Sequence, residues 1–180
     1  GAVQASDGED ILHERHIGYG SLVMAVGSTA NYFGVPGARE HTISLNVTED
    51  AERFRLRLLR LMAVAEQARE ERSDAVAALD VVIIGGGATG VELAAELREA
   101  SGVYAAYGFN RLQVQRDVRI TLLEGAPRIL APLPERVSAS ATRLLDERAI
   151  RVVTNCRVTQ IDAHRVTDNA GQIYPSDICV

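Results

Sequence analysis

The pattern of apolar and polar residues becomes regular at Thr48. After this residue, apolar positions recur every three or four residues, which predicts an amphipathic helix. Its apolar stripe is expected to consist of Phe54, Leu58, Leu61, Ala65 and Ala68. Arginines fall on another face of the helix. We interpret that face as solvated rather than membrane-bound, because helices that cover their own domain commonly show this pattern.

From residue 79 onward, short apolar runs alternate with segments of helical period. The expected strands lie at 81–84, 118–123, 150–153 and 178–180, and the expected helices at 89–101 and 134–147. A loop is predicted at 102–117. The helical period stops after residue 153, and residues 157–174 predict an antiparallel meander in place of the next crossover helix. This order predicts an α/β, Rossmann-like fold with a parallel sheet, helices on both faces and a β-meander crossover.

The first 47 residues show no strand–glycine–helix unit, and we interpret them as part of something larger. Short strands are expected at 11–17 and 22–26, followed by a loop at 31–41 that glycine and proline mark. The chain therefore divides into residues 1–47, a β-hairpin with its connecting loop, and residues 48–180, a domain whose last strand is cut short.

The expected strand at 81–84 runs directly into Gly-x-Gly-x-x-Gly, and a helix-forming run follows. This order is the context that a dinucleotide-binding fingerprint requires. Gly85 permits the tight turn, Gly87 leaves room for a pyrophosphate, and Gly90 lets the helix pack close to the strand. The helix N-terminus then offers free N–H groups to the phosphates. The alternative is that these glycines only allow a helix to pack on a sheet.

Three further residues carry candidate chemistry. Glu124 ends the second strand of the domain, where a carboxylate accepts hydrogen bonds from the ribose hydroxyls and repels a 2′-phosphate, so NAD(H) is favoured over NADP(H). It lies further from the glycines than the usual spacing of about 20 residues, and the segment 102–117 accounts for the excess; the alternative is a surface carboxylate. Thr89 either contacts the pyrophosphate or caps the helix. Glu92, expected in the first turn, either complements the helix dipole or acts on the cofactor.

Composition excludes several classes of function. The formal charge of −5 gives no indication of a nucleic-acid partner. All 19 basic residues are arginine, so lysine nucleophiles and a Walker-type phosphate loop are excluded within this sequence. No apolar run reaches the ~20 residues that span a bilayer. Cys156 and Cys179 are isolated and are expected to be buried thiols. The four histidines show no metal-ligand spacing, so no metal site is predicted.

Several segments resemble known flavoproteins. Residues 85–97 are similar to the NAD(H) fingerprint of flavoproteins with two dinucleotide-binding domains. Residues 22–28 resemble the Ala-Thr-Gly segment of the same superfamily, with Val26 where threonine is usual. Residues 107–111, 117–124 and 126–136 narrow the resemblance to type II NADH dehydrogenases. The similarity extends from about residue 11 to the C-terminus.

This resemblance implies an activity and a set of site residues. The family oxidises NADH through FAD and passes the electrons to a quinone at the membrane surface, with the NAD(H) domain inserted into the FAD domain. Residues 1–47 would then be a partial FAD-domain segment. The residues expected to hold NADH are Gly85, Gly87, Ala88, Thr89, Gly90 and Glu124. Glu92 is the candidate catalytic residue, near the contact of nicotinamide and flavin. The residues expected beside FAD are Ala25, Gly27 and Ser28.

The sequence lacks a second Gly-x-Gly-x-x-Gly and a redox cysteine pair. We therefore expect an NAD(H)-binding fragment that is inactive alone. The full-length enzyme is expected to be a peripheral protein on the cytoplasmic face of the inner membrane, and to bind the membrane through other segments. A homodimer is left open. The alternatives are another flavoprotein, of the ferredoxin reductase or coenzyme A-disulfide reductase type, a non-enzymatic NADH-sensing module, or an α/β domain without a ligand.

Overall fold

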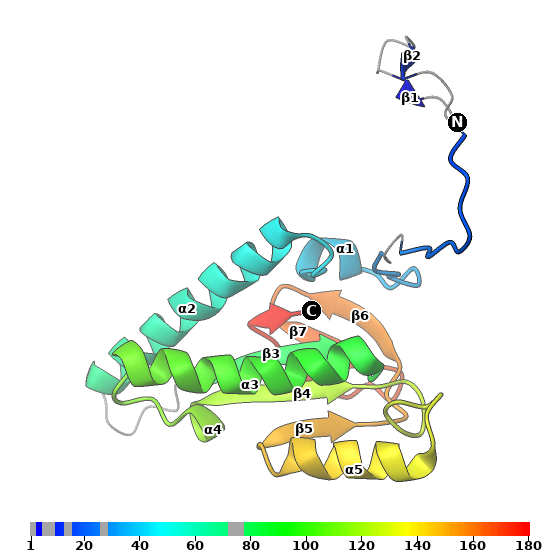
Figure 1. The fold of residues 1–180 in the computed structure, drawn as a ribbon. Helices are drawn as coiled ribbons and strands as arrows, with labels where there is room; N and C mark the ends of the chain where they lie inside the picture. The colour runs from blue at the N-terminus through cyan, green and yellow to red at the C-terminus, as the bar shows by residue number, and fades with distance from the viewer. Residues whose placement is uncertain (1–2, 5–9, 13–15, 26–28, 72–77) are drawn as a thin grey trace.

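The computed structural model describes residues 3–4, 10–12, 16–25, 29–71 and 78–180 (Figure 1). Within this part, four parallel strands form the central sheet in the order β5-β4-β3-β9. The strands are β3 (Leu79–Ile84), β4 (Val118–Leu123), β5 (Ile150–Val153) and β9 (Ile178–Cys179). Val81 of β3 lies between Ile120 of β4 and Ile178 of β9. The predicted α/β fold with a parallel sheet is confirmed.

One face of the sheet is covered by the long helices, and the other by a second sheet. The helices are α2 (Thr48–Glu71), α3 (Ala88–Gly108), the short α4 (Val114–Asp117) and α5 (Glu135–Asp146). Their apolar residues share one core with the sheet: Leu58 and Met62 of α2, Ala94 and Leu97 of α3, and Leu145 of α5 contact the face that presents Val81, Ile120 and Leu122. Met62 is fully buried, although the predicted stripe did not include it.

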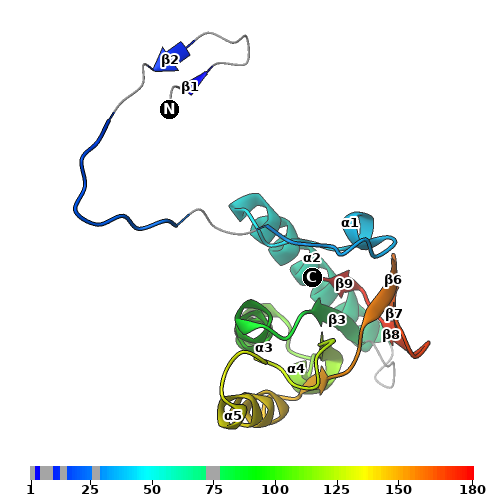
Figure 2. The same ribbon diagram turned by 90° about the vertical axis from the view of Figure 1, so that its right-hand side faces the viewer.

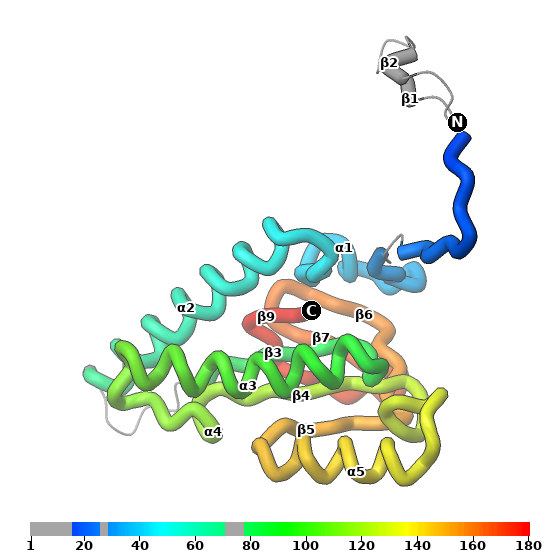
Figure 3. The backbone as a smooth tube through the Cα atoms, viewed as in Figure 1, coloured from blue at the N-terminus to red at the C-terminus, as the bar shows by residue number. Residues whose placement is uncertain are grey.

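The opposite face packs against the antiparallel meander, as Figure 2 shows. The meander consists of β6 (Val158–Asp162), β7 (Arg165–Asp168) and β8 (Ile173–Pro175), and the four-residue helix α1 (Ala38–His41) lies beside β6. Helices were expected on both faces, but α1 is the only helix among the described residues on this one. The meander takes the place of the helix that would otherwise connect β5 to β9 (Figure 3).

Three predicted segments differ from the structure by more than a few residues. Helix α3 continues through Gly102 to Gly108, where a loop was expected. The Arg98 guanidinium donates to the carbonyls of Val114 and Ala149, so tertiary contacts hold this part of the helix. Within the helix, the buried Ser101 hydroxyl donates to the Leu97 carbonyl. Residues 22–25 form no strand, because no described strand pairs with them. Of the strand expected at 11–17, Ile11 and Leu12 belong to β2 (Asp10–Leu12), which pairs with β1 (Val3–Gln4). Residues 16 and 17 belong to no strand, and residues 13–15 lie outside the described residues.

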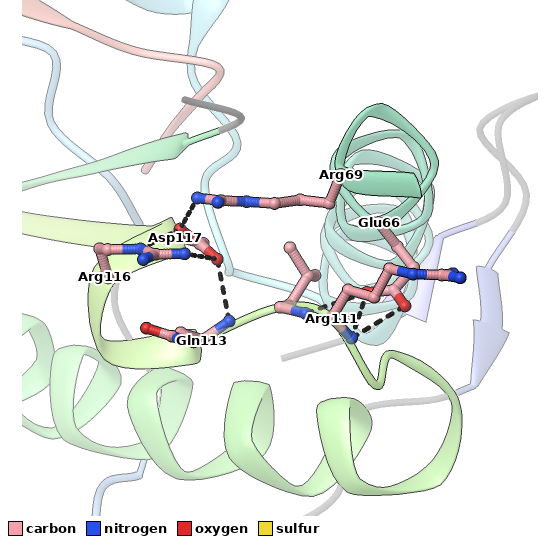
Figure 4. Close-up of polar contacts among 7 residues, drawn as sticks. Glu66, Arg69, Arg111, Gln113, Arg116 and Asp117 are labelled. Carbon is pink, nitrogen blue, oxygen red and sulfur yellow. Dashed lines mark hydrogen bonds and ion pairs between the residues drawn. The ribbon is translucent and has the colours of Figure 1, made fainter. Parts of the chain in front are cut away.

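A buried ion pair fixes the connection between α3 and β4 (Figure 4). The Asp117 carboxylate, 2% exposed, accepts a hydrogen bond from Arg69 of α2 at 2.6 Å and one from the Gln113 N–H at 2.9 Å. Glu66, one helical turn earlier in α2, accepts hydrogen bonds from the N–H groups of Arg111 and Leu112. Helix α2 is therefore bound to this connection through two carboxylate-mediated contacts at the amino-terminal end of β4.

Candidate functional site

The glycine loop joins the carboxyl end of β3 to the start of α3. Gly85 has a φ of 111°, a conformation that favours glycine, and its N–H donates to the Leu123 carbonyl at the end of β4. A Cβ on Gly90 would lie 1.9 Å from the carbonyl oxygen of Gly85, so only glycine allows α3 to approach the loop this closely. The roles expected for these two glycines, a tight turn and close helix packing, agree with the geometry.

Gly87 differs from its neighbours because the fold itself does not require glycine there. Its φ is −73°, which any residue can adopt, and a Cβ at this position would meet no atom within 4 Å. Gly87 is also the N-cap of α3, and no side chain caps this helix end. No protein atom therefore fills the space of a Gly87 side chain, and no side chain satisfies the first N–H groups of α3, which have no partner within the helix.

Glu124 lies at the end of β4, as expected, and holds the glycine loop. One carboxylate oxygen accepts a hydrogen bond from the Gly86 N–H at 2.6 Å, and the other accepts one from the Ala126 N–H at 2.6 Å. A carboxylate has about four lone-pair positions, so the half-buried side chain can still accept hydrogen bonds from a ligand. Its position beside the glycines is set by the backbone, since the Gly85 N–H is bound to the residue before it.

Gly86 is a site residue that sequence reasoning missed. A Cβ there would lie 2.7 Å from Cγ2 of Ile129 and 2.9 Å from a carboxylate oxygen of Glu124, and Gly86 is buried. Its carbonyl accepts a hydrogen bond from the Leu130 N–H at 2.7 Å. The signal in the sequence was an additional glycine between Gly85 and Gly87, at a position where the fingerprint admits any residue.

At the start of α3, one of the two alternatives for Thr89 is ruled out, and the position expected for Glu92 was wrong. Thr89 does not cap the helix, because α3 begins at Ala88 and Thr89 is its second residue; its side chain is exposed. Glu92 is the fifth residue of α3, so it lies beyond the first turn, which contains no acidic residue. Glu92 is exposed, as is Ala88. A role for Glu92 as a partner of the helix dipole is therefore weakened, since this effect falls off after the first turn.

The residues expected beside FAD are only partly described. Ala25 is exposed and belongs to no helix or strand, and Gly27 and Ser28 lie outside the described residues.

Cys156 and Cys179 are free and buried, as expected. Burial raises the pKa of both thiols, that of Cys179 to about 12, so neither is a reactive thiolate at neutral pH. Among the described helices, none has the length and apolar character needed to cross a membrane.

The chain is similar to a well-defined group of proteins. It matches the family described as pyridine nucleotide-disulphide oxidoreductase over residues 2–180. A type II NADH:quinone oxidoreductase of Haemophilus influenzae is 31% identical over 99% of this chain and 42% of its own length. An external alternative NAD(P)H-ubiquinone oxidoreductase of Solanum tuberosum mitochondria is 37% identical over 81% of this chain and 25% of its own length. The chain thus spans less than half the length of these curated relatives.

Solved structures share the fold. NDH2 from Plasmodium falciparum in complex with NADH superposes with a TM-score of 0.70 at 19% identity, covering 86% of this chain and 32% of that chain. A ferredoxin reductase from Rhodopseudomonas palustris gives a TM-score of 0.63 at 23% identity, covering 97% of this chain and 35% of that chain. The resemblance to type II NADH dehydrogenases is confirmed by the relatives that bear that name. With the family match extending over residues 2–180, the chain belongs to the pyridine nucleotide-disulphide oxidoreductase family.

Proposed function

We propose that residues 48–180 are the NAD(H)-binding domain of an FAD-dependent NADH:quinone oxidoreductase. The whole enzyme would pass a hydride from NADH to FAD and electrons from FAD to a quinone. The type II NADH:quinone oxidoreductase of Haemophilus influenzae aligns with 99% of the present chain, which supports the proposal. We also propose that the whole protein associates peripherally with the cytoplasmic face of the inner membrane, and that residues 1–47 belong to its FAD domain.

The observation that carries the proposal is the open space at Gly87. Gly90 and Gly85 are explained by packing and by backbone conformation, and a domain without a ligand would need both. Neither packing nor backbone conformation requires a glycine at position 87. A glycine that leaves the N–H groups of a helix end accessible suits a pyrophosphate, whose oxygens must approach the backbone closely. The residues present therefore fit a dinucleotide.

The roles of the site residues follow from this placement. Gly85, Gly87, Ala88, Thr89 and Gly90 would bind the pyrophosphate, and Glu124 would accept hydrogen bonds from the adenosine ribose. Glu92 would face the nicotinamide from the second turn of α3. When bound, FAD supplies the hydride-accepting chemistry, and this chain would contact it through Ala25, Gly27 and Ser28. The described residues bind and orient the dinucleotide.

Calorimetric titration of the 180-residue chain with NADH, NADPH and FAD in parallel tests the proposal. We expect binding of NADH, weaker binding of NADPH, and little or no binding of FAD. Absence of NADH binding by a folded chain would reject a competent NAD(H) site. Tight FAD binding with quinone reduction would contradict the assignment of this chain to the NAD(H)-binding part alone.

Replacing Gly87 with alanine is expected to weaken NADH binding at least about tenfold, because the new methyl group enters the space assigned to the pyrophosphate. Alanine is a poorer N-cap than glycine, so the fold should lose no more than about 1 kcal/mol. Calorimetry and thermal unfolding measure the two effects. Gly108→Ala, at the far end of α3 with no atom within 4 Å of its Cβ, is the matched control. Equal NADH affinities for the two variants would contradict the assignment.

Replacing Glu124 with alanine should weaken NADH binding by about 1–3 kcal/mol, because a charged hydrogen bond to the ribose is lost. NADPH binding should fall less, because the charge that repels the 2′-phosphate is also removed. Glu124 holds the N–H groups of Gly86 and Ala126 as well, and a purely structural role would lower both affinities by the same factor. The ratio of the two dissociation constants is therefore the decisive measurement. Glu135→Ala, an exposed glutamate on α5, controls for the change in net charge.

A further inference from the structure

The loop that follows β4 forms hydrogen bonds with both the N–H and the carbonyl of Gly86. Glu124 accepts the hydrogen bond of the Gly86 N–H, and the Leu130 N–H donates to the Gly86 carbonyl. The fully buried Ile129 fills the space where a side chain at Gly86 would lie. The middle of the glycine loop is therefore positioned by residues 124–130 rather than by its own strand or helix.

The position of the Leu130 N–H depends in turn on a tight turn over residues 130–133. The Leu133 N–H donates to the Leu130 carbonyl at 2.8 Å and closes this turn. Leu130 has a φ of 51°, a left-handed conformation that leucine keeps only when the surrounding contacts hold it. Some other group must therefore stabilise the turn against relaxation to an ordinary conformation.

Arg128 is that group. Its guanidinium donates to the carbonyl oxygens of Leu133 at 2.9 Å, Leu130 at 3.3 Å and Ala131 at 2.5 Å. Its five N–H donors in a rigid fork suit three neighbouring acceptors, which a lysine ammonium cannot match in the same geometry. No carboxylate among the described residues pairs with Arg128. An arginine near the ribose-binding acid can bind the 2′-phosphate of NADP(H), but here the guanidinium is occupied by its own loop.

We propose that Arg128 is a positioning residue of the nucleotide site. It fixes the turn at 130–133, the turn places the Leu130 N–H on the Gly86 carbonyl, and the glycine loop is thereby held ready before the dinucleotide binds. Preorganisation of this kind increases affinity because the loop need not be ordered on binding. The effect on NADH rests on the function proposed above, whereas the effect on the loop does not.

Three variants of the 180-residue chain separate positioning from charge. Arg128→Met removes both the charge and the three hydrogen bonds, and Arg128→Lys keeps the charge alone. Arg136→Met is the matched control, because Arg136 is exposed on α5 and its guanidinium makes no hydrogen bond or ion pair with another described residue. In calorimetric titrations we expect NADH to bind about tenfold more weakly to both Arg128 variants. The Arg136 variant should bind NADH as the unmodified chain does.

Amide hydrogen exchange without any nucleotide gives the second measurement. The Gly86 and Leu130 amides should exchange about tenfold faster in both Arg128 variants, while the amides of β3 remain protected and show that the variants are folded. Full NADH affinity of Arg128→Lys, or unchanged exchange of Leu130 in Arg128→Met, would overturn the proposal. If the unmodified chain binds no NADH but the exchange rates change as expected, the proposed function fails and the positioning of Gly86 by Arg128 stands.

Discussion

Replacing Gly90 with alanine is expected to destabilise the fold by about 3 kcal/mol, at the upper end for overpacking, and to abolish nucleotide binding. The new Cβ would lie 1.9 Å from the carbonyl oxygen of Gly85 and 3.2 Å from its carbonyl carbon. These are backbone atoms in a loop held at both ends, so they cannot rotate away as a flexible side chain would. Helix α3 must move off the sheet, and its contacts through Ala94 and Leu97 are weakened.

The measurement is denaturant unfolding at fixed temperature, with NADH titration of each folded variant. Gly102→Ala is the control in the same helix, because a Cβ there meets no atom within 4 Å. Alanine is the better helix former, so this variant should gain up to about 1 kcal/mol. If the two variants have equal free energies of unfolding, α3 does not pack against the glycine loop as closely as the structure shows.

Replacing Asp117 with alanine is expected to cost about 3–5 kcal/mol, as the loss of one partner of a buried ion pair usually does. The Asp117 and Arg69 side chains are 2% and 12% exposed, and removal of the carboxylate leaves the Arg69 charge without its partner (Figure 4). The Gln113 N–H loses its acceptor as well. Asp162→Ala is the contrast: its pair with Arg165 has the similar distance of 2.7 Å but lies at the surface, so its loss should cost less than about 1 kcal/mol.

The same residue predicts a dependence of stability on pH. Burial of the Asp117 carboxyl favours its neutral form, but hydrogen bonds from Arg116 and the Gln113 N–H, and the charges of Arg69 and Arg116, hold its pKa below 3.8. When a carboxyl has a lower pKa in the folded chain than in the unfolded chain, it stabilises the fold at any pH above its unfolded pKa. This stability is lost as the pH falls through the folded pKa. The unmodified chain should therefore lose more stability than Asp117→Ala between pH 5 and pH 2. Parallel acid dependences of the two proteins would contradict the ion pair.

The strands β4 and β5 were predictable because β-branched residues and leucine predominate in them. Residues 118–123 and 150–153 were predicted with the bounds that these strands have, although Arg119 and Arg151 are exposed. The end of α3 was not predictable. Gly102 and two tyrosines indicated a loop, while the contacts of Arg98 with Val114 and Ala149 are between residues far apart in sequence.

The candidate site was predictable where a local pattern indicates its residues. The glycines follow a spacing that can be recognised in the chain, whereas Glu124 was predicted from its position at the end of a strand, because its spacing departs from the usual one. Gly86 and Arg128 were missed because their roles depend on the conformation of a loop, and a left-handed leucine at position 130 gives no signal in the sequence. The strand predicted over residues 22–26 is not present at residues 22–25, the part that the structure describes, because an apolar run forms a strand only if another strand lies beside it.

The pairing of β9 with β3 also determines when this protein can fold. The Asp80 N–H is bound to the Asp177 side chain, 97 positions later in the chain, and the Ile84 N–H next to the glycine loop donates to the Val180 carbonyl. Contacts between such distant residues close a long loop and form slowly. During synthesis, β3 can pair with β4 once residue 123 has been added, but its other edge stays unpaired until β9 has left the ribosome. Until then, this edge of β3 is open to pairing with other chains, which favours aggregation.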